Sequence, residues 1–128
     1  MLKSESSDGT KTDKTYDYIC FSDVVYECDS SDFKKVEKKI KRRLKYYSLA
    51  AYDQERVAYI RVLKDELCRE ISLQSKSKYY SKSESKYADL SDFDISKMTS
   101  DYLETFTKIN ESDMAQILKF AIYIYYLR

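Results

Sequence analysis

The sequence contains no histidine, no proline and no tryptophan, and it has a single glycine, Gly9, among its 128 residues. Without histidine, the chain has no imidazole general base, no Ser-His or Cys-His nucleophilic pair and no histidine-ligated metal. A single glycine also excludes the glycine-rich loops that bind phosphates in P-loop and dinucleotide-binding proteins. We therefore expect no catalytic residues, no cofactor and no enzymatic activity.

Cysteine is also scarce, with Cys20, Cys28 and Cys68 at wide spacings. Zinc sites usually draw four nitrogen or sulfur ligands from close pairs, so these three residues predict no metal site. An odd number of cysteines cannot pair completely within one chain, and the N-terminal stretch lacks the basic and apolar regions of a signal peptide. A reducing, intracellular compartment is the simplest interpretation, without distinguishing cytoplasm from nucleus or nucleoid.

The near absence of glycine and proline favours long helices joined by links rich in serine and aspartate, because glycine and proline usually mark turns. With 43% hydrophobic and 35% charged residues, the composition fits one domain with a modest core. We predict an all-α fold, a small bundle of about four helices over residues 15–128. From their composition, we predict that residues 1–14 form a disordered tail and that the Ser/Lys-rich residues 75–89 form a flexible loop within the domain.

Apolar residues recur every three or four positions in two neighbouring stretches and predict helices there. The first stripe is Phe33, Val36, Ile40, Leu44 and Tyr47, and the second is Ile60, Leu63, Leu67 and Ile71. The interval from Ile40 to Ile60 equals about 5.5 turns at roughly 3.6 residues per turn, so the two stripes would point in nearly opposite directions on one helix. A break within Ser48–Asp53 is therefore favoured over a single long helix that uses both faces.

Two segments suit both helix and strand. Thr15–Cys28 is aromatic and β-branched, and we favour a short helix near Asp23–Glu27 over a strand. Met114–Leu127 is apolar on almost every side, which favours a central core helix, Glu111–Tyr126, over a buried strand. This run contains Lys119 and stays below the roughly 18 residues that crossing a bilayer needs, so we predict no membrane span.

The starts of the last two helices carry capping signals, in which a polar residue precedes an acid by three positions. Ser91 followed by Asp94 predicts a helix capped by Ser91, and Asn110 followed by Asp113 predicts a helix capped by Asn110. The first of these helices carries the apolar stripe Ile95, Met98, Tyr102, Phe106 and Ile109.

The most unusual stretch is FKKVEKKIKRRLKYY, residues 33–47, where eight basic residues stand against a single acid, Glu37, although the whole chain has a net charge of only +1. The basic residues are Lys34, Lys35, Lys38, Lys39, Lys41, Arg42, Arg43 and Lys45. On a helix, Lys34, Lys38, Lys41 and Lys45 follow one row and Lys35, Lys39 and Arg42 follow an adjacent row, so the basic arc is broad and lies opposite the apolar stripe. Such an arc suits nucleic acid, since each neutralised phosphate releases condensed counterions, and Tyr46 and Tyr47 can add stacking on unpaired bases. It also suits an acidic protein, an anionic membrane surface or a solvated outer face.

Arg42–Leu67, with the sequence RRLKYYSLAAYDQERVAYIRVLKDEL, resembles the N-terminal helices of small phage transcription regulators. Those proteins join a basic helix with tyrosines to a helix of mixed charge, and the resemblance implies DNA binding. It rests on composition, and the helix-turn-helix of those regulators is not evident downstream, so it identifies no family.

Together these patterns predict a small non-enzymatic helical binding protein. Its basic helix would contact an anionic partner, with nucleic acid favoured, in a regulatory or accessory role. The alternative is a protein interaction or assembly module, a homodimer or a subunit of a larger complex, without nucleic-acid contact. Two features motivate this alternative: the apolarity of Met114–Leu127, and the second apolar stripe, which would serve as a partner interface. That interface would comprise Ile60, Leu63, Leu67 and Ile71.

Overall fold

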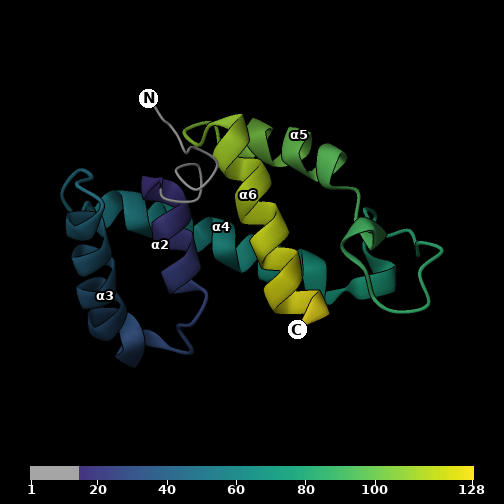
Figure 1. The fold of residues 1–128 in the computed structure, drawn as a ribbon, viewed down its shortest axis with the longest axis horizontal. Helices are drawn as coiled ribbons and strands as arrows, with labels where there is room; N and C mark the ends of the chain where they lie inside the picture. The colour runs from purple at the N-terminus through teal and green to yellow at the C-terminus, as the bar shows by residue number, and fades with distance from the viewer. Residues whose placement is uncertain (1–14) are drawn as a thin grey trace. The chain divides into compact units, whose positions relative to one another are not determined.

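The computed structural model describes residues 15–128, and the predicted disordered tail, residues 1–14, lies outside them (Figure 1). The described residues form five α-helices and four short helical turns, without a β-strand beyond an isolated bridge between Tyr80 and Phe93. The prediction of an all-α fold built as a small helical bundle is confirmed. None of the helices in this range combines the length and apolarity that crossing a bilayer requires.

The packing divides the chain into two compact units, one ending at Val62 and the other beginning at Leu63. The single domain predicted for residues 15–128 stays a prediction. The first unit holds α2 (Tyr16–Val24), η1 (Ser30–Asp32), α3 (Phe33–Tyr46) and the start of α4 (Gln54–Ser72). The second holds the rest of α4, η2 (Gln74–Lys76), η3 (Leu90–Asp92), α5 (Ile95–Thr105), α6 (Glu111–Ile122) and the π-helical turn η4 (Tyr123–Leu127).

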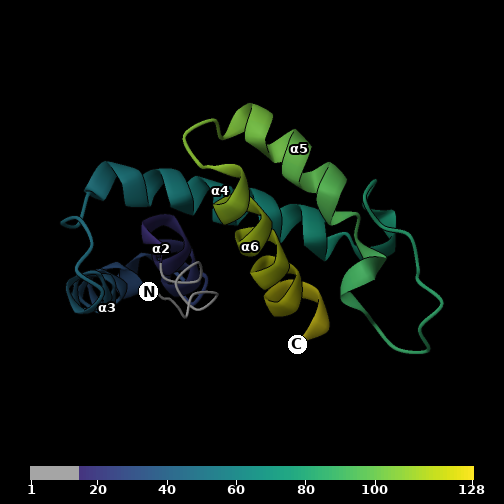
Figure 2. The ribbon, with the colours of Figure 1, turned by 45° about the horizontal axis from the view of Figure 1, so that its top comes forward.

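Helix α2 lies beside α3 in the first unit (Figures 1 and 2). It begins after Thr15, whose hydroxyl accepts a hydrogen bond from the Tyr18 amide and so caps the helix. Its fully buried apolar residues are Ile19, Cys20, Phe21 and Val24. The helix predicted near Asp23–Glu27 is therefore wrong in position, because Thr15 starts the helix earlier and the chain leaves it after Val24.

Helix α3 directs Val36, Ile40 and Leu44 into the core, as its apolar stripe predicts. The predicted break after it is confirmed, since α3 ends at Tyr46 and α4 begins at Gln54. Ser48 has a φ of 56°, in the left-handed region that glycine usually occupies. The amides of Ser48 and Leu49 donate to the carbonyls of Lys45 and Leu44, respectively, at 3.1 and 2.9 Å, which is the Schellman arrangement that ends a helix.

Helices α5 and α6 lie against each other in the second unit, as both ribbon views show (Figures 1 and 2). Helix α6 buries residues on nearly every turn, in agreement with the predicted core helix and against a strand there. Its buried apolar residues are Met114, Ile117, Leu118, Ala121 and Ile122. The last residues, Tyr123–Leu127, continue as a π-helical turn.

One of the two predicted caps is confirmed and the other is wrong. Asn110 caps α6 by accepting a hydrogen bond from the Asp113 amide at 2.7 Å. Helix α5 is capped by Asp94 instead of Ser91, with the Lys97 amide donating to Asp94 at 3.0 Å. Phe93 lies between Ser91 and Asp94 in an extended conformation, with a φ of −112° and a ψ of 138°, so the helix begins only after Asp94.

The Ser/Lys-rich segment, residues 75–89, is attached to the second unit at several points. Ser77 and Tyr79 are buried, and the Ser77 hydroxyl donates to Glu70 at 2.6 Å. The Ser83 amide donates to the buried Asp92 carboxylate at 2.8 Å. The flexibility predicted for this segment stays a prediction.

Candidate functional site

Seven of the eight predicted basic residues are exposed on α3, and Arg43 is partly buried. The Arg43 guanidinium donates to the buried Asp23 carboxylate at 2.8 Å, and the Lys39 ammonium lies 3.6 Å from the same carboxylate. The Lys41 ammonium lies 2.7 Å from the Glu37 carboxylate, one turn earlier on the same helix. Three of the eight cations are thus paired with acids of the first unit.

The other five cations have no ion pair with any residue from 15 to 128, and we call them the basic arc. They are Lys34, Lys35, Lys38, Arg42 and Lys45. At roughly 100° per residue, they cover about 100° of the helix circumference, centred nearly opposite the buried Ile40. Their span along the helix axis is about 16 Å at roughly 1.5 Å per residue. Burial of the stripe therefore turns the whole arc toward solvent.

Two further acids near α2 are also paired, and their partners are arginines of α4. The Arg56 guanidinium donates through Nε and Nη2 to the two carboxylate oxygens of Asp17, at 2.8 and 2.6 Å. Arg61 forms the same two-bond arrangement with Glu27, at 2.7 Å for each bond. Such paired bonds match the planar guanidinium to a carboxylate. Because arginines hold them, the carboxylates of Asp17 and Glu27 do not neutralise the arc.

Two features flank the C-terminal end of the basic arc. The Tyr46 side chain is 79% exposed, and its ring lies edge-on to that of Tyr47, with the ring centroids 4.8 Å apart. A hollow of about 490 Å³ lies beside the end of the helix. Its lining residues are Lys41, Leu44, Lys45, Leu49, Ala50, Ala51 and Tyr52. Lys45 therefore belongs to both the arc and the hollow.

Unlike the basic arc, the predicted partner interface lies in the interior of the folded chain. Its residues, Ile60, Leu63, Leu67 and Ile71, are all fully buried in the folded chain. They present no exposed surface, so we base no partner interface on them. A stripe at helical spacing has the same appearance in the sequence whether the chain's own core or another molecule covers it.

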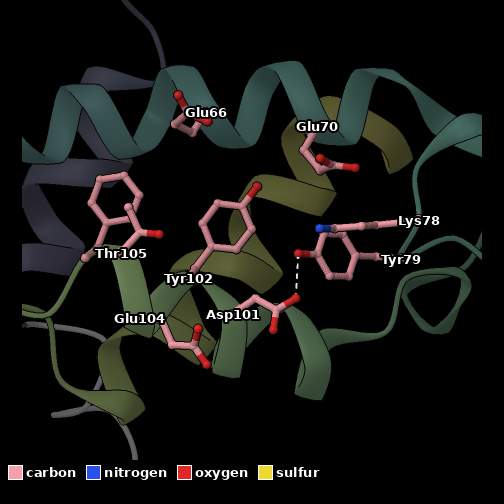
Figure 3. Close-up of a pocket in the computed structure, with 9 residues that line it drawn as sticks. Glu66, Glu70, Lys78, Tyr79, Asp101, Tyr102, Glu104 and Thr105 are labelled. Carbon is pink, nitrogen blue, oxygen red and sulfur yellow. Dashed lines mark hydrogen bonds between the residues drawn. The ribbon is translucent and has the colours of Figure 1, made fainter.

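Sequence analysis missed an acidic pocket in the second unit, with a volume of about 340 Å³ (Figure 3). Its lining residues are Glu66, Glu70, Lys78, Tyr79, Asp101, Tyr102, Glu104, Thr105 and Phe106. Figure 3 shows the Tyr79 hydroxyl directed at Asp101, to which it donates a hydrogen bond of 2.8 Å. The spacing of Glu66 and Glu70 places them on one face of a helix, but only the fold brings Asp101 opposite them.

The chemistry of this pocket is that of hydrogen bonding. Burial raises the pKa of Tyr102 to about 12. Burial and the hydrogen bond to Asp101 raise the pKa of Tyr79 above its ordinary value. Both hydroxyls are therefore protonated at neutral pH and act as neutral donors. Among residues 15–128, no group of three or more acidic or cysteine side chains is arranged to hold a metal ion.

No protein-family model, no curated protein and no solved structure matches the chain. The resemblance of Arg42–Leu67 to phage regulators gains no support from these comparisons. The functional argument therefore depends on the chain's own surfaces, and the basic arc is the most strongly charged of those described above.

Proposed function

We propose that the protein is a non-enzymatic nucleic-acid-binding protein whose contact surface is the basic arc of α3. The observation that carries this proposal is the arc itself, five exposed cations with no ion pair to any of residues 15–128. Some cations elsewhere in residues 15–128 lie beside acids: Arg69 pairs with Glu66 at 2.6 Å, and Lys64 pairs with Asp65 at 2.8 Å. Five like charges on one face of a helix repel one another, and a polyanion relieves that repulsion.

The charge density of the arc supports nucleic acid over an acidic protein. Each strand of a DNA duplex presents one phosphate about every 3.4 Å along the axis, so about five phosphates lie along the roughly 16 Å that the arc spans. The linear charge density of the arc is therefore comparable to that of one strand of the duplex. Each cation that neutralises a phosphate releases counterions, which provides affinity without any base contact. The alternative, an assembly module, loses one of its two motivating features because the predicted interface stripe is buried.

The test is a fluorescence-anisotropy titration of labelled duplex DNA at several salt concentrations. If all five cations contact phosphates, the logarithm of the binding constant should fall against the logarithm of the salt concentration with a slope of about −4.5. The double variant Lys38→Gln/Arg42→Gln should bind more weakly and reduce the magnitude of that slope by about two. Both side chains are exposed, so the fold should survive.

A matched control removes the same charge from the second unit. Lys86 and Lys119 are exposed, and the variant Lys86→Gln/Lys119→Gln should keep the wild-type slope. Equal losses from the two double variants would mean that net charge alone drives binding. Binding that does not weaken with salt would also contradict the proposal.

A further inference from the structure

We infer that the surface prefers single-stranded over duplex nucleic acid, with unpaired bases bound at the C-terminal end of α3. This inference rests on the proposed function and adds the form of the nucleic acid. A duplex offers phosphates on its outside and keeps its bases stacked within. A single strand offers the same phosphates together with free base faces, which stack on exposed aromatic rings.

Tyr46 provides such a ring at the edge of the basic arc. On the helix it lies about 20° beyond Lys35 and about 40° from Arg42, and it follows Arg42 by one turn. Its 79% exposure leaves most of the ring open to a base. The edge-on contact with Tyr47 is the arrangement that aromatic pairs favour, so it helps to orient the Tyr46 ring.

The hollow beside Lys45 offers a second place for a base. Its volume of about 490 Å³ lies within the roughly 300–1,000 Å³ that is typical of small-ligand sites. Apolar side chains supply most of its lining, the Lys41 ammonium lies 5.3 Å from the centroid of the Tyr52 ring in its wall, and Lys45 supplies a cation without an ion pair to any of residues 15–128. A strand with a phosphate on Lys45 can therefore direct the neighbouring bases to Tyr46 or into the hollow.

A second hollow beside α3, of about 250 Å³, shows why the C-terminal end is favoured. This second hollow is lined by Asp23, Tyr26, Asp32, Lys35, Val36 and Lys39. It contains two carboxylates, those of Asp23 and Asp32, which repel phosphates. Among residues 15–128, the lining of the hollow beside Lys45 includes no acid. Of these two hollows beside α3, the one beside Lys45 therefore suits a nucleotide better.

The experiment compares three labelled probes of equal length, about 12 nucleotides: a single strand, the same strand without bases, and the matching duplex. The wild-type protein should bind the base-bearing strand about five- to a hundredfold more tightly than the abasic strand, the range that stacking provides. Tyr46→Ala should remove most of that preference and leave affinity for the abasic strand and the duplex unchanged. Tyr46→Trp should retain it. DNA and RNA versions of the strand show which backbone the site accepts.

Two controls separate the contribution of the bases to binding from the effects of a variant on folding or on net charge. Tyr87, 74% exposed in the second unit, gives the matched variant Tyr87→Ala, which should keep the preference. Ala50→Asp places a carboxylate in the hollow and should weaken single-strand binding more than Ala88→Asp, which adds the same charge at an exposed position of the second unit. Circular dichroism should be unchanged for all five single variants.

The outcomes separate this inference from the proposed function. If the base-bearing and abasic strands bind equally, or if Tyr46→Ala weakens duplex binding as much as single-strand binding, the inference fails. The proposed function is then still supported if Lys38→Gln/Arg42→Gln binds more weakly and with a smaller salt dependence than the wild type. If no probe binds with salt-dependent affinity, the proposed function fails and this inference fails with it.

Discussion

The two units bury their carboxylates in different ways. In the first unit each buried or partly buried acid of α2 and the following turn is held by an arginine. These pairs are Asp17 with Arg56, Asp23 with Arg43, and Glu27 with Arg61. In the second unit the fully buried Asp92 accepts hydrogen bonds from neutral groups, namely the Tyr126 hydroxyl at 2.6 Å and the amides of Ser83 and Asp89 at 2.8 and 3.1 Å. Among residues 15–128, its one ionic neighbour is the Lys82 ammonium, at 3.6 Å.

This difference shows how the basic arc stays available. At Asp17 and Glu27 a planar guanidinium donates to both carboxylate oxygens, whereas Arg43 donates to only one oxygen of Asp23. The lysines of α3 have long, flexible and strongly hydrated side chains, and most of them remain in solvent. The inner cations, Arg43, Arg56 and Arg61, therefore support the fold. The outer cations, which form the basic arc, are free to bind a partner.

The largest effect should come from breaking an inner pair of the first unit. Asp23→Ala leaves the Arg43 guanidinium partly buried without its carboxylate, which should lower the free energy of unfolding by about 3–5 kcal/mol. Urea denaturation followed by circular dichroism measures this change. Glu55→Ala, at an exposed acid of the same unit, should change stability by less than about 1 kcal/mol. A similar loss in both variants would show that Asp23 is not a buried partner.

A smaller effect should follow from Asp92→Asn in the second unit, because asparagine keeps the shape and one acceptor. Burial by itself raises the pKa of Asp92, but the hydrogen bonds from Tyr126, Ser83 and Asp89 outweigh burial and lower it below its ordinary value. At pH values between the pKa of Asp92 in the folded protein and its ordinary value near 4, the unfolded chain binds more protons than the folded chain. The stability from Asp92 is therefore complete above that range and is lost as the pH falls through it.

Thermal unfolding between about pH 3 and pH 7 tests this dependence. Asp92→Asn should have a lower Tm than the wild type at neutral pH, and the difference should shrink as the pH falls. Glu84→Gln, at an exposed position of the same unit, should follow the wild-type curve. A constant difference across the range would mean that ionisation of Asp92 does not contribute.

The smallest effect on stability should come from the outer cations. Lys38→Gln and Lys45→Gln should each change the free energy of unfolding by no more than about 0.5 kcal/mol, although both should weaken binding to nucleic acid. Arg43→Gln, on the same helix, should destabilise the protein much more because it leaves Asp23 without its guanidinium. The same urea titration measures all three. If Lys38→Gln is as costly as Arg43→Gln, the distinction between inner and outer cations is wrong.

Local signals succeeded where the structure depends on neighbours in the chain. The cap at Asn110 needs only the Asp113 amide three residues on, and the spacing of Val36, Ile40 and Leu44 determines which side of α3 is apolar. The cap expected at Ser91 failed because Phe93 pairs with Tyr80, thirteen residues earlier, and holds the backbone extended there. Such a contact has no local signature.

The amino-acid sequence by itself determined the helical class of the protein, the break after α3 and the concentration of cations on one helix. These properties follow from composition and short-range periodicity, which act within a few residues. Only the tertiary structure decided that Arg43 turns toward Asp23 while Arg42, its neighbour, faces solvent. The two arginines share one chemistry but lie about 100° apart around the helix, and burial of Ile40 and Leu44 turns Arg43 toward the α2 side and Arg42 toward solvent. That rotation separates the cations that stabilise the fold from those that can bind a partner.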